Sequence, residues 1–225
     1  MEIDRSKVFE IKKAKFYLPN YQTDCISNIM VSTMNYWDNW KVGALSIIDK
    51  YLPENAVIAD IGANVGSHSI YWALERNVLK IYSFEPYPET FEVLKTNVML
   101  NNLENTIEVS NFGLSDEFGS FVVEDYNPRN IGATVFKKSM SGNFYFCPFD
   151  DLKISEPIDM IKIDVEGGEV DVLNGMKKTM VKSHPIIVIE TFNHKKEVDD
   201  YMHNFNYSQV ETIREGEDYI YTYSG

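Results

Sequence analysis

Hydrophobic positions between residues 56 and 190 alternate between short β-branched runs and stretches with helical spacing. The runs are bounded by Gly, Pro or Asn, which is typical of buried strands, and they lie at 56–61, 80–85, 106–111, 158–164 and 186–190. Between them, apolar residues recur at i, i+3 and i+4, which predicts helices over 66–76, from Pro88 past Val98, and from Gly168 to about Met180. Strands that alternate with helices predict βαβ units and a parallel sheet.

The segments before and after this alternation of strands and helices, and one segment within it, follow other patterns. Residues 118–149 hold three aromatic or β-branched runs separated by Asn, Pro and Gly, which predicts a small β-hairpin insertion. An amphipathic stretch at 36–51, with Trp37 and Trp40, predicts a helix over the carboxyl edge of the sheet. After residue 190 we expect a helix near 196–205 and two short Tyr-rich strands. The chain thus divides into an N-terminal helical segment, 1–55, that covers the mouth of the site, and a main domain, 56–225.

The net charge and the cysteine content limit which binding partners and which cellular compartment we expect. Among 225 residues, 21 Lys and Arg against 34 Asp and Glu give a net charge of −13, which disfavours nucleic acid and anionic lipid surfaces as partners. Two cysteines, Cys25 and Cys147, exclude a disulfide framework and suit a reducing cytosol. Because neither a signal peptide nor a long apolar run occurs, we expect a cytoplasmic protein without a membrane span. The oligomeric state stays open.

The chemistry is expected just after each strand, because ligands of open α/β sheets bind beyond the carboxyl ends of the strands. These positions hold an acidic rim around a glycine loop, at 60–66, 85–86, 111–113, 164–167 and 190–194. Gly62 and Gly66 allow a tight turn with close backbone approach. Glu85 ends the second strand, where a carboxylate can accept hydrogen bonds from both hydroxyls of a ribose.

Two cofactors use this geometry. A dinucleotide requires Gly-x-Gly-x-x-Gly, and the loop from Asp60 to Gly66 lacks one of these glycines. An adenosyl sulfonium carries no phosphate, and its positive sulfur and ammonium suit acids such as Asp60 and Asp164. The loop therefore favours S-adenosylmethionine over NAD.

Several segments, taken in order, resemble the FkbM-type family of S-adenosylmethionine-dependent methyltransferases. They are 60–66, 84–91, 94–101, 159–169, 173–175 and 185–190. The resemblance implies an α/β class I methyltransferase fold, Rossmann-like, with a mainly parallel seven-stranded sheet, helices on both faces and an antiparallel last strand. It also implies O-methylation, often of sugars or natural products.

The resemblance further implies roles for single residues. Asp60 and Gly62 meet the methionine part of the donor, Glu85 meets the ribose, and 111–113 flank the adenine. The full set expected to bind the cofactor is Asp60, Gly62, Ala63, Asn64, Gly66, Glu85, Pro86, Asn111, Phe112, Gly113 and Asp164. The chain departs from the family pattern at Gly168, where alanine or a bulkier residue is usual, and in its short terminal parts, which build the acceptor pocket.

A sugar hydroxyl is weakly acidic, so its methylation requires a general base or a metal ion. The candidates for a catalytic base are Asp164, Glu166, Glu190 and His194. Alternatively, the oxygen-rich set of Asp164, Glu190 and Asn193 holds a divalent cation such as Mg²⁺.

Lys162 lies within the fourth strand and points to the same face as Asp164. A buried ammonium requires a carboxylate partner, so we expect Lys162 to pair with Asp60, Glu190 or Asp164. The alternative is a lysine whose head reaches the solvent at the rim of the sheet.

We therefore expect an O-methyltransferase that acts on a hydroxyl of a sugar or glycan precursor, for a surface polysaccharide or a glycosylated natural product. A methyltransferase of a non-sugar small molecule and a non-catalytic S-adenosylmethionine-binding module are alternatives. An NAD-dependent oxidoreductase is a weaker alternative, because the glycine loop lacks a residue that NAD requires.

Overall fold

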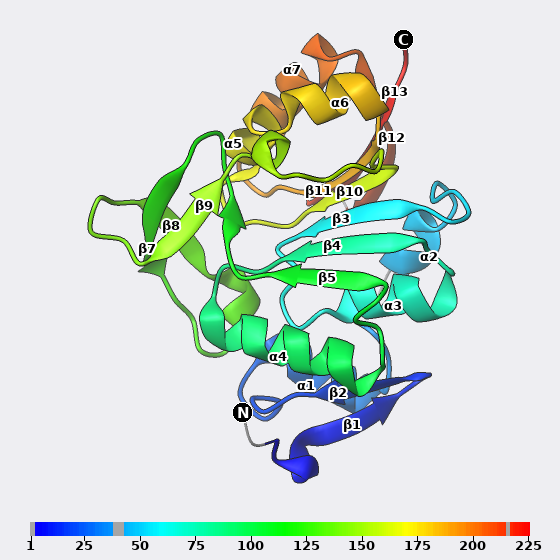
Figure 1. Ribbon diagram of the computed structural model, residues 1–225, viewed down its shortest axis with the longest axis vertical. Coiled ribbons are helices and arrows are strands. Elements are labelled where there is room, and N and C mark those ends of the chain that lie inside the picture. The colour runs from blue at the N-terminus through cyan, green and yellow to red at the C-terminus, as the bar shows by residue number, and fades with distance from the viewer. Residues whose placement is uncertain (1–2, 38–42, 215–216) are drawn as a thin grey trace.

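A seven-stranded sheet forms the centre of the computed structural model, which describes residues 3–37, 43–214 and 217–225 (Figure 1). Its strand order is β12–β13–β11–β10–β3–β4–β5. The bounds are β3 Val57–Ile61, β4 Lys80–Phe84, β5 Ile107–Ser110, β10 Met160–Ile163, β11 Ile186–Glu190, β12 Tyr207–Arg214 and β13 Asp218–Tyr223. β13 pairs antiparallel with both β11 and β12, and the other neighbouring pairs of this sheet are parallel. The five predicted central strands and the antiparallel last strand are confirmed, and the fold is that of class I methyltransferases.

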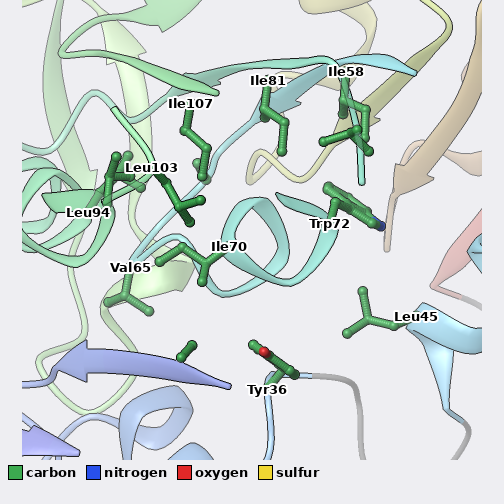
Figure 2. Close-up of a cluster of buried hydrophobic side chains, with 14 of the residues drawn as sticks. Tyr36, Leu45, Ile58, Val65, Ile70, Trp72, Ile81, Leu94, Leu103 and Ile107 are labelled. Carbon is green, nitrogen blue, oxygen red and sulfur yellow. The ribbon is translucent and has the colours of Figure 1, made fainter. Parts of the chain in front are cut away.

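Helices cover both faces of this sheet (Figure 1). One face carries α3 (Ser67–Glu75) and α4 (Pro88–Leu100), and the other carries α5 (Glu169–Asn174), α6 (Lys177–Ser183) and α7 (Lys195–Asn204). Successive strand residues point to opposite faces, so each strand contributes to two cores. The core under α3 and α4 contains Ile58, Ile81 and Ile107 packed with Ile70, Trp72 and Leu94 (Figure 2). The second core contains Ala59, Ile61, Ile161 and Ile163 with Val172, Met176, Val198 and Met202.

The single helix predicted up to Met180 is wrong, because the chain forms α5 and α6 with a break at Gly175 and Met176. A side chain at Gly175 would place its Cβ 2.1 Å from the carbonyl oxygen of Ser115, so the chain passes there at close range. The Asp150 carboxylate then accepts hydrogen bonds from the backbone N–H groups of Lys178 (2.7 Å) and Thr179 (2.9 Å). These bonds start a new helix after the break.

The predicted hairpin insertion is a four-stranded sheet with the order β6–β9–β7–β8. Its strands are β6 Gly113–Leu114, β7 Gly119–Asp125, β8 Val135–Lys138 and β9 Phe144–Cys147, with short 3-10 turns at Ile131–Ala133 and Phe149–Asp151. It lies beside the carboxyl ends of the central strands (Figure 1). The insertion is therefore placed to form one wall of any site at that edge.

The prediction of a helical N-terminal segment is wrong for its first part. After a 3-10 turn at Arg5–Lys7 it begins with a hairpin of β1 (Val8–Ile11) and β2 (Ala14–Tyr17), followed by α1 (Cys25–Thr33) and α2 (Ala44–Ile48). Alternate apolar residues of the hairpin face the core, and backbone N–H groups of β2 donate to the side-chain oxygens of Asn97 in α4 and of Asn101 just after it. In the described residues, the helix predicted over 36–51 is limited to α2, and Trp40 lies outside them. None of the helices in these ranges is long and apolar enough to cross a membrane.

Candidate active site

The loop after β3 is held against the end of β10 by a glycine. Gly62 has φ +78°, and a Cβ there would lie 1.9 Å from the carbonyl oxygen of Asp164, so no other residue fits without moving the backbone. The N–H groups of Gly62 and Ala63 both donate to the carbonyl oxygen of Phe84 at 3.0 Å. The loop is thereby fastened to the ends of two neighbouring strands.

Glu85 lies directly after β4 and is 7% exposed. Its two carboxylate oxygens accept hydrogen bonds from the backbone N–H groups of Asn64 (3.0 Å) and Tyr87 (2.9 Å). Burial nevertheless raises the pKa of Glu85 to about 7. The two hydrogen bonds therefore hold the carboxylate in one orientation, and burial still disfavours its ionised form.

Two cavities meet at this edge of the sheet. The insertion-side cavity has a volume of about 380 Å³, and the N-terminal-side cavity has a volume of about 280 Å³. We call the residues that line both cavities the junction: Gly62, Asn64, Glu85, Gly132, Asp164 and Glu166. Three of these junction residues are acids on the ends of β4 and β10.

The insertion-side cavity has an apolar, aromatic wall. Its apolar lining comes largely from the insertion and includes Phe84, Leu114, Phe121, Ile131, Phe136 and Phe146. Such a wall suits a flat adenine ring, and the Glu85 carboxylate at the junction suits a ribose diol. The acids Asp164 and Glu166 suit a cationic group. The side chains of this edge therefore fit the parts of S-adenosylmethionine.

Lys162 is buried and ion-paired, as predicted. Its Nζ lies 2.9 Å from Oδ2 of Asp164 and 3.5 Å from Oδ1 of Asp60, and the residue is 6% exposed. Burial alone would lower the pKa of Lys162, but the two carboxylates outweigh burial and raise it. Asp60 is fully buried, also accepts a bond from Ser69 Oγ at 2.5 Å, and is not among the residues that line either cavity. The structure thus places Asp60 beneath Lys162, away from the position expected for a donor-binding group.

A second cationic group, Arg214, was not identified from the sequence. It lines the N-terminal-side cavity, where its NH2 group lies 2.7 Å from Glu190 Oε1 and its Nε lies 3.0 Å from Asp218 Oδ2. Burial raises the pKa of Glu190 above its ordinary value, and Asp164 adds to this effect. The pairing of β11 with β13 and of β13 with β12 brings these three residues together. The one feature of the sequence that sets this residue apart is that Arg214 is the one arginine after Arg129.

Asn111 and Phe112 line neither of the two cavities. The Asn111 side-chain amide donates to the carbonyl oxygens of Glu85 (2.9 Å) and Pro86 (3.2 Å), and Phe112 packs on Phe84. Of the residues expected to flank adenine, Gly113 lines the insertion-side cavity, as does Pro86. Ala63 and Gly66 are not cavity-lining residues, and Gly66 instead precedes α3 with φ +83°. These residues support the loops from which the lining residues project.

His194 and Asn193 line neither of the two cavities. His194 Nδ1 lies 2.6 Å from Glu197 Oε2, its side chain is 42% exposed, and Asn193 is exposed. Within the described ranges, no group of three or more His, Cys, Asp or Glu side chains is placed to hold a metal ion. Asp164 and Glu190 instead bond to Lys162 and Arg214. The expected metal set is therefore not assembled in these residues.

The departure from the family pattern at Gly168 has a mild structural effect. A Cβ at this position would meet only Val165 Cγ2, at 3.8 Å, which is an ordinary contact. The larger residue that is usual in the family would therefore fit this backbone.

The N-terminal segment supplies lining residues, and sequence analysis had placed one of them, Trp37, over this edge of the sheet. Ile26 and Trp37 line the N-terminal-side cavity together with His68. His68 Nε2 donates to the carbonyl oxygen of Trp37 at 2.7 Å, and burial lowers the pKa of His68 to about 4. His68 is therefore neutral at pH 7, and it ties the N-terminal segment to α3.

Comparisons with known proteins support a methyltransferase. The sequence profile described as methyltransferase FkbM domain matches residues 60–209, more than half of the chain. Methyltransferase sdnD of Sordaria araneosa is 27% identical over 177 residues, which cover 63% of this chain and 68% of that protein. Hexuronic acid methyltransferase AglP of Haloferax volcanii is 30% identical over 141 residues, which cover 60% of this chain and 56% of that protein.

A solved structure supports the fold. Methyltransferase FkbM from Methylobacillus flagellatus KT matches with a TM-score of 0.56 at 14% identity, over 91% of this chain and 57% of that chain. The chain thus spans less than two thirds of AglP and of this solved protein.

Proposed function

Because the chain belongs to the FkbM methyltransferase family, we propose that it transfers the methyl group of S-adenosylmethionine to a hydroxyl group of a sugar or glycan precursor. The observation that carries this proposal is the junction, where two cavities meet beside Glu85, Asp164 and Glu166. Methyl transfer requires a donor and an acceptor on opposite sides of one point, in line. A relative named as a hexuronic acid methyltransferase supports a sugar as the acceptor.

The donor occupies the insertion-side cavity in this proposal. Its adenine lies against the aromatic wall, its ribose hydroxyls donate to Glu85, and its cationic end faces the acids of the junction. When bound, S-adenosylmethionine supplies an electrophilic methyl group on a positive sulfur. The protein's task is then to hold the acceptor oxygen in line with that methyl group and to remove its proton.

The acceptor occupies the N-terminal-side cavity, and Glu190 is the base. Asp164 and Glu166 line both cavities, whereas Glu190 lines only the N-terminal-side cavity. Burial raises the pKa of Glu190, so its carboxylate is a stronger proton acceptor once ionised, and the share of the ionised form rises with pH. The NH2 group of Arg214 lies 2.7 Å from this carboxylate. Asp164 is a weaker candidate because it lines both cavities and so does not lie on the acceptor side alone.

Other acceptors and roles lead to different results in the same assays. A non-sugar small molecule would use the same donor site, and a non-catalytic module would bind donor without transfer. An NAD-dependent oxidoreductase would bind NAD, but the loop from Gly62 to Gly66 lacks one glycine of that motif. The net charge of −13 and the acids of the junction disfavour a nucleic acid as the acceptor.

The direct test is incubation with methyl-labelled S-adenosylmethionine and a panel of free sugars, glycosides and nucleotide sugars, followed by mass spectrometry. We expect a labelled sugar product with the wild-type protein. Glu190→Gln should lower its formation by roughly 10²-fold or more, as expected for loss of a general base, while S-adenosylhomocysteine affinity stays within a few-fold. A wild-type protein that binds S-adenosylhomocysteine but labels no sugar would contradict the assignment of the acceptor.

A further inference from the structure

Glu166 differs from the other two acids of the junction in having no partner. Glu85 accepts two backbone N–H bonds, and Asp164 is bonded to Lys162. Glu166 forms no hydrogen bond or ion pair with any residue in the ranges 3–37, 43–214 and 217–225. It is therefore the one junction carboxylate whose charge is not balanced by the described part of the protein.

The surroundings of Glu166 make that unbalanced charge costly. Burial, the nearby Asp164 and Glu169 together raise the pKa of Glu166 to about 7. The next residue, Gly167, has φ +84°, and a Cβ there would meet nothing within 4 Å. Glu166 lines both cavities, so a cation bound at the junction would stabilise its charge.

We infer that Glu166 determines the preference for methyl donor over demethylated product, because its carboxylate faces the positive sulfur of S-adenosylmethionine. This inference rests on the proposed function. During transfer, the acceptor oxygen forms a bond to the methyl carbon while the bond between sulfur and that carbon breaks. The electron pair of the broken bond stays on sulfur, and the acceptor's proton passes to Glu190. The sulfur therefore changes from positive to neutral, and Glu166 loses its counterion.

This role affects binding more than the rate of the chemical step. The positive charge on sulfur is largest in the ground state and decreases toward the transition state. An interaction with that charge thus favours bound donor over bound product and does not by itself lower the barrier. S-adenosylhomocysteine leaves Glu166 unbalanced again, so its release is favoured.

The test compares the dissociation constants of S-adenosylmethionine and S-adenosylhomocysteine, measured by calorimetry for each variant. In Glu166→Gln we expect the preference for the donor to fall about tenfold relative to wild type, mainly through weaker donor binding, as for loss of one nearby opposite charge. The affinity for S-adenosylhomocysteine should stay within about twofold. Glu166→Asp retains the charge and should retain most of the preference.

The matched control is Glu104→Gln, which makes the same change of charge at an exposed residue before β5, at the opposite edge of the sheet. It should show the wild-type preference. Glu166→Ala serves as a second neutral variant, and thermal melting reports whether each variant is folded. An unchanged preference in a folded neutral variant, or an equal loss of affinity for both ligands, would overturn the inference. A wild-type protein that binds neither ligand would instead refute the proposed function.

Discussion

At the scale of single residues, Glu85 is the group on which donor binding depends most directly. Its carboxylate is fixed by the N–H groups of Asn64 and Tyr87 and lines both cavities. We expect Glu85→Gln to weaken S-adenosylhomocysteine binding by about 1.5–3 kcal/mol, the usual loss for hydrogen bonds to a charged acceptor. Calorimetric titration measures this loss, with Glu104→Gln as the control. An unchanged affinity would refute the ribose assignment.

The pKa of Glu85 predicts how donor binding depends on pH. Because burial raises this pKa to about 7, the carboxylate of the free protein is mainly protonated at pH 6 and mainly ionised at pH 8. Only the ionised form accepts hydrogen bonds from both ribose hydroxyls. The affinity for S-adenosylhomocysteine should therefore rise roughly tenfold from pH 6 to pH 8. Glu85→Gln should flatten this profile, and a profile equally steep in that variant would assign the titration to another group.

The raised pKa of Glu85 affects folding stability in the opposite direction, so the free energy of unfolding falls as pH rises. In the range between its unfolded pKa near 4.5 and its folded pKa near 7, Glu85 binds more protons in the folded state. Its contribution to the free energy of unfolding is therefore present at low pH and is lost as pH rises through about 7.

Lys162 carries a prediction about the buried charges of the sheet. Without it, the fully buried Asp60 would keep only its bond from Ser69 among the residues that the structure describes. Lys162→Met should lower the free energy of unfolding by about 3–5 kcal/mol, because it leaves a buried charge unbalanced. The double variant Asp60→Asn with Lys162→Met removes both charges and should recover most of the loss. Urea denaturation measures both effects, and a Lys162→Met protein as stable as wild type would rule out this role.

At the scale of secondary structure, Asp150 caps α6. Its carboxylate accepts bonds from the N–H groups of Lys178 and Thr179 and from Thr179 Oγ1 at 2.7 Å. We expect Asp150→Ala to cost about 1 kcal/mol and to lower the melting temperature by about 2–4 °C. The adjacent exposed acid offers a control, since Asp151→Ala removes no such bonds. Equal melting temperatures for the two variants would show that the cap adds little.

The elements that sequence predicted well are those whose pattern is local. The central strands are continuous apolar runs bounded by turn residues, so their positions follow from burial on both faces. The break between α5 and α6 depends on the contact of Gly175 with Ser115, sixty positions earlier, which no local pattern contains. Sequence analysis did not predict the β1–β2 hairpin. Its apolar residues alternate with other residues, but the lysines within 12–15 interrupt this alternation.

At the scale of the whole molecule, the site combines strand ends with segments that are distant in sequence. The cavity-lining acids at 85, 164 and 190 were predicted because parallel strands end at one edge, whereas Asp60, predicted on the same ground, lines neither cavity. Arg214 reaches the same edge only through the pairing of three C-terminal strands, and the wall of the insertion-side cavity depends on how the insertion folds back. The insertion thus lines the proposed donor side, and the N-terminal segment lines the proposed acceptor side.

The most direct test of the central claim is calorimetric titration of the wild-type protein with S-adenosylhomocysteine and, separately, with NAD. Both ligands contain an adenosine whose ribose hydroxyls can donate to Glu85. Only NAD carries a pyrophosphate, and the loop from Gly62 to Gly66 lacks one glycine of the motif that binds it. The account predicts saturable one-site binding of S-adenosylhomocysteine and no measurable binding of NAD at the same concentrations. Binding of NAD without binding of S-adenosylhomocysteine would contradict it.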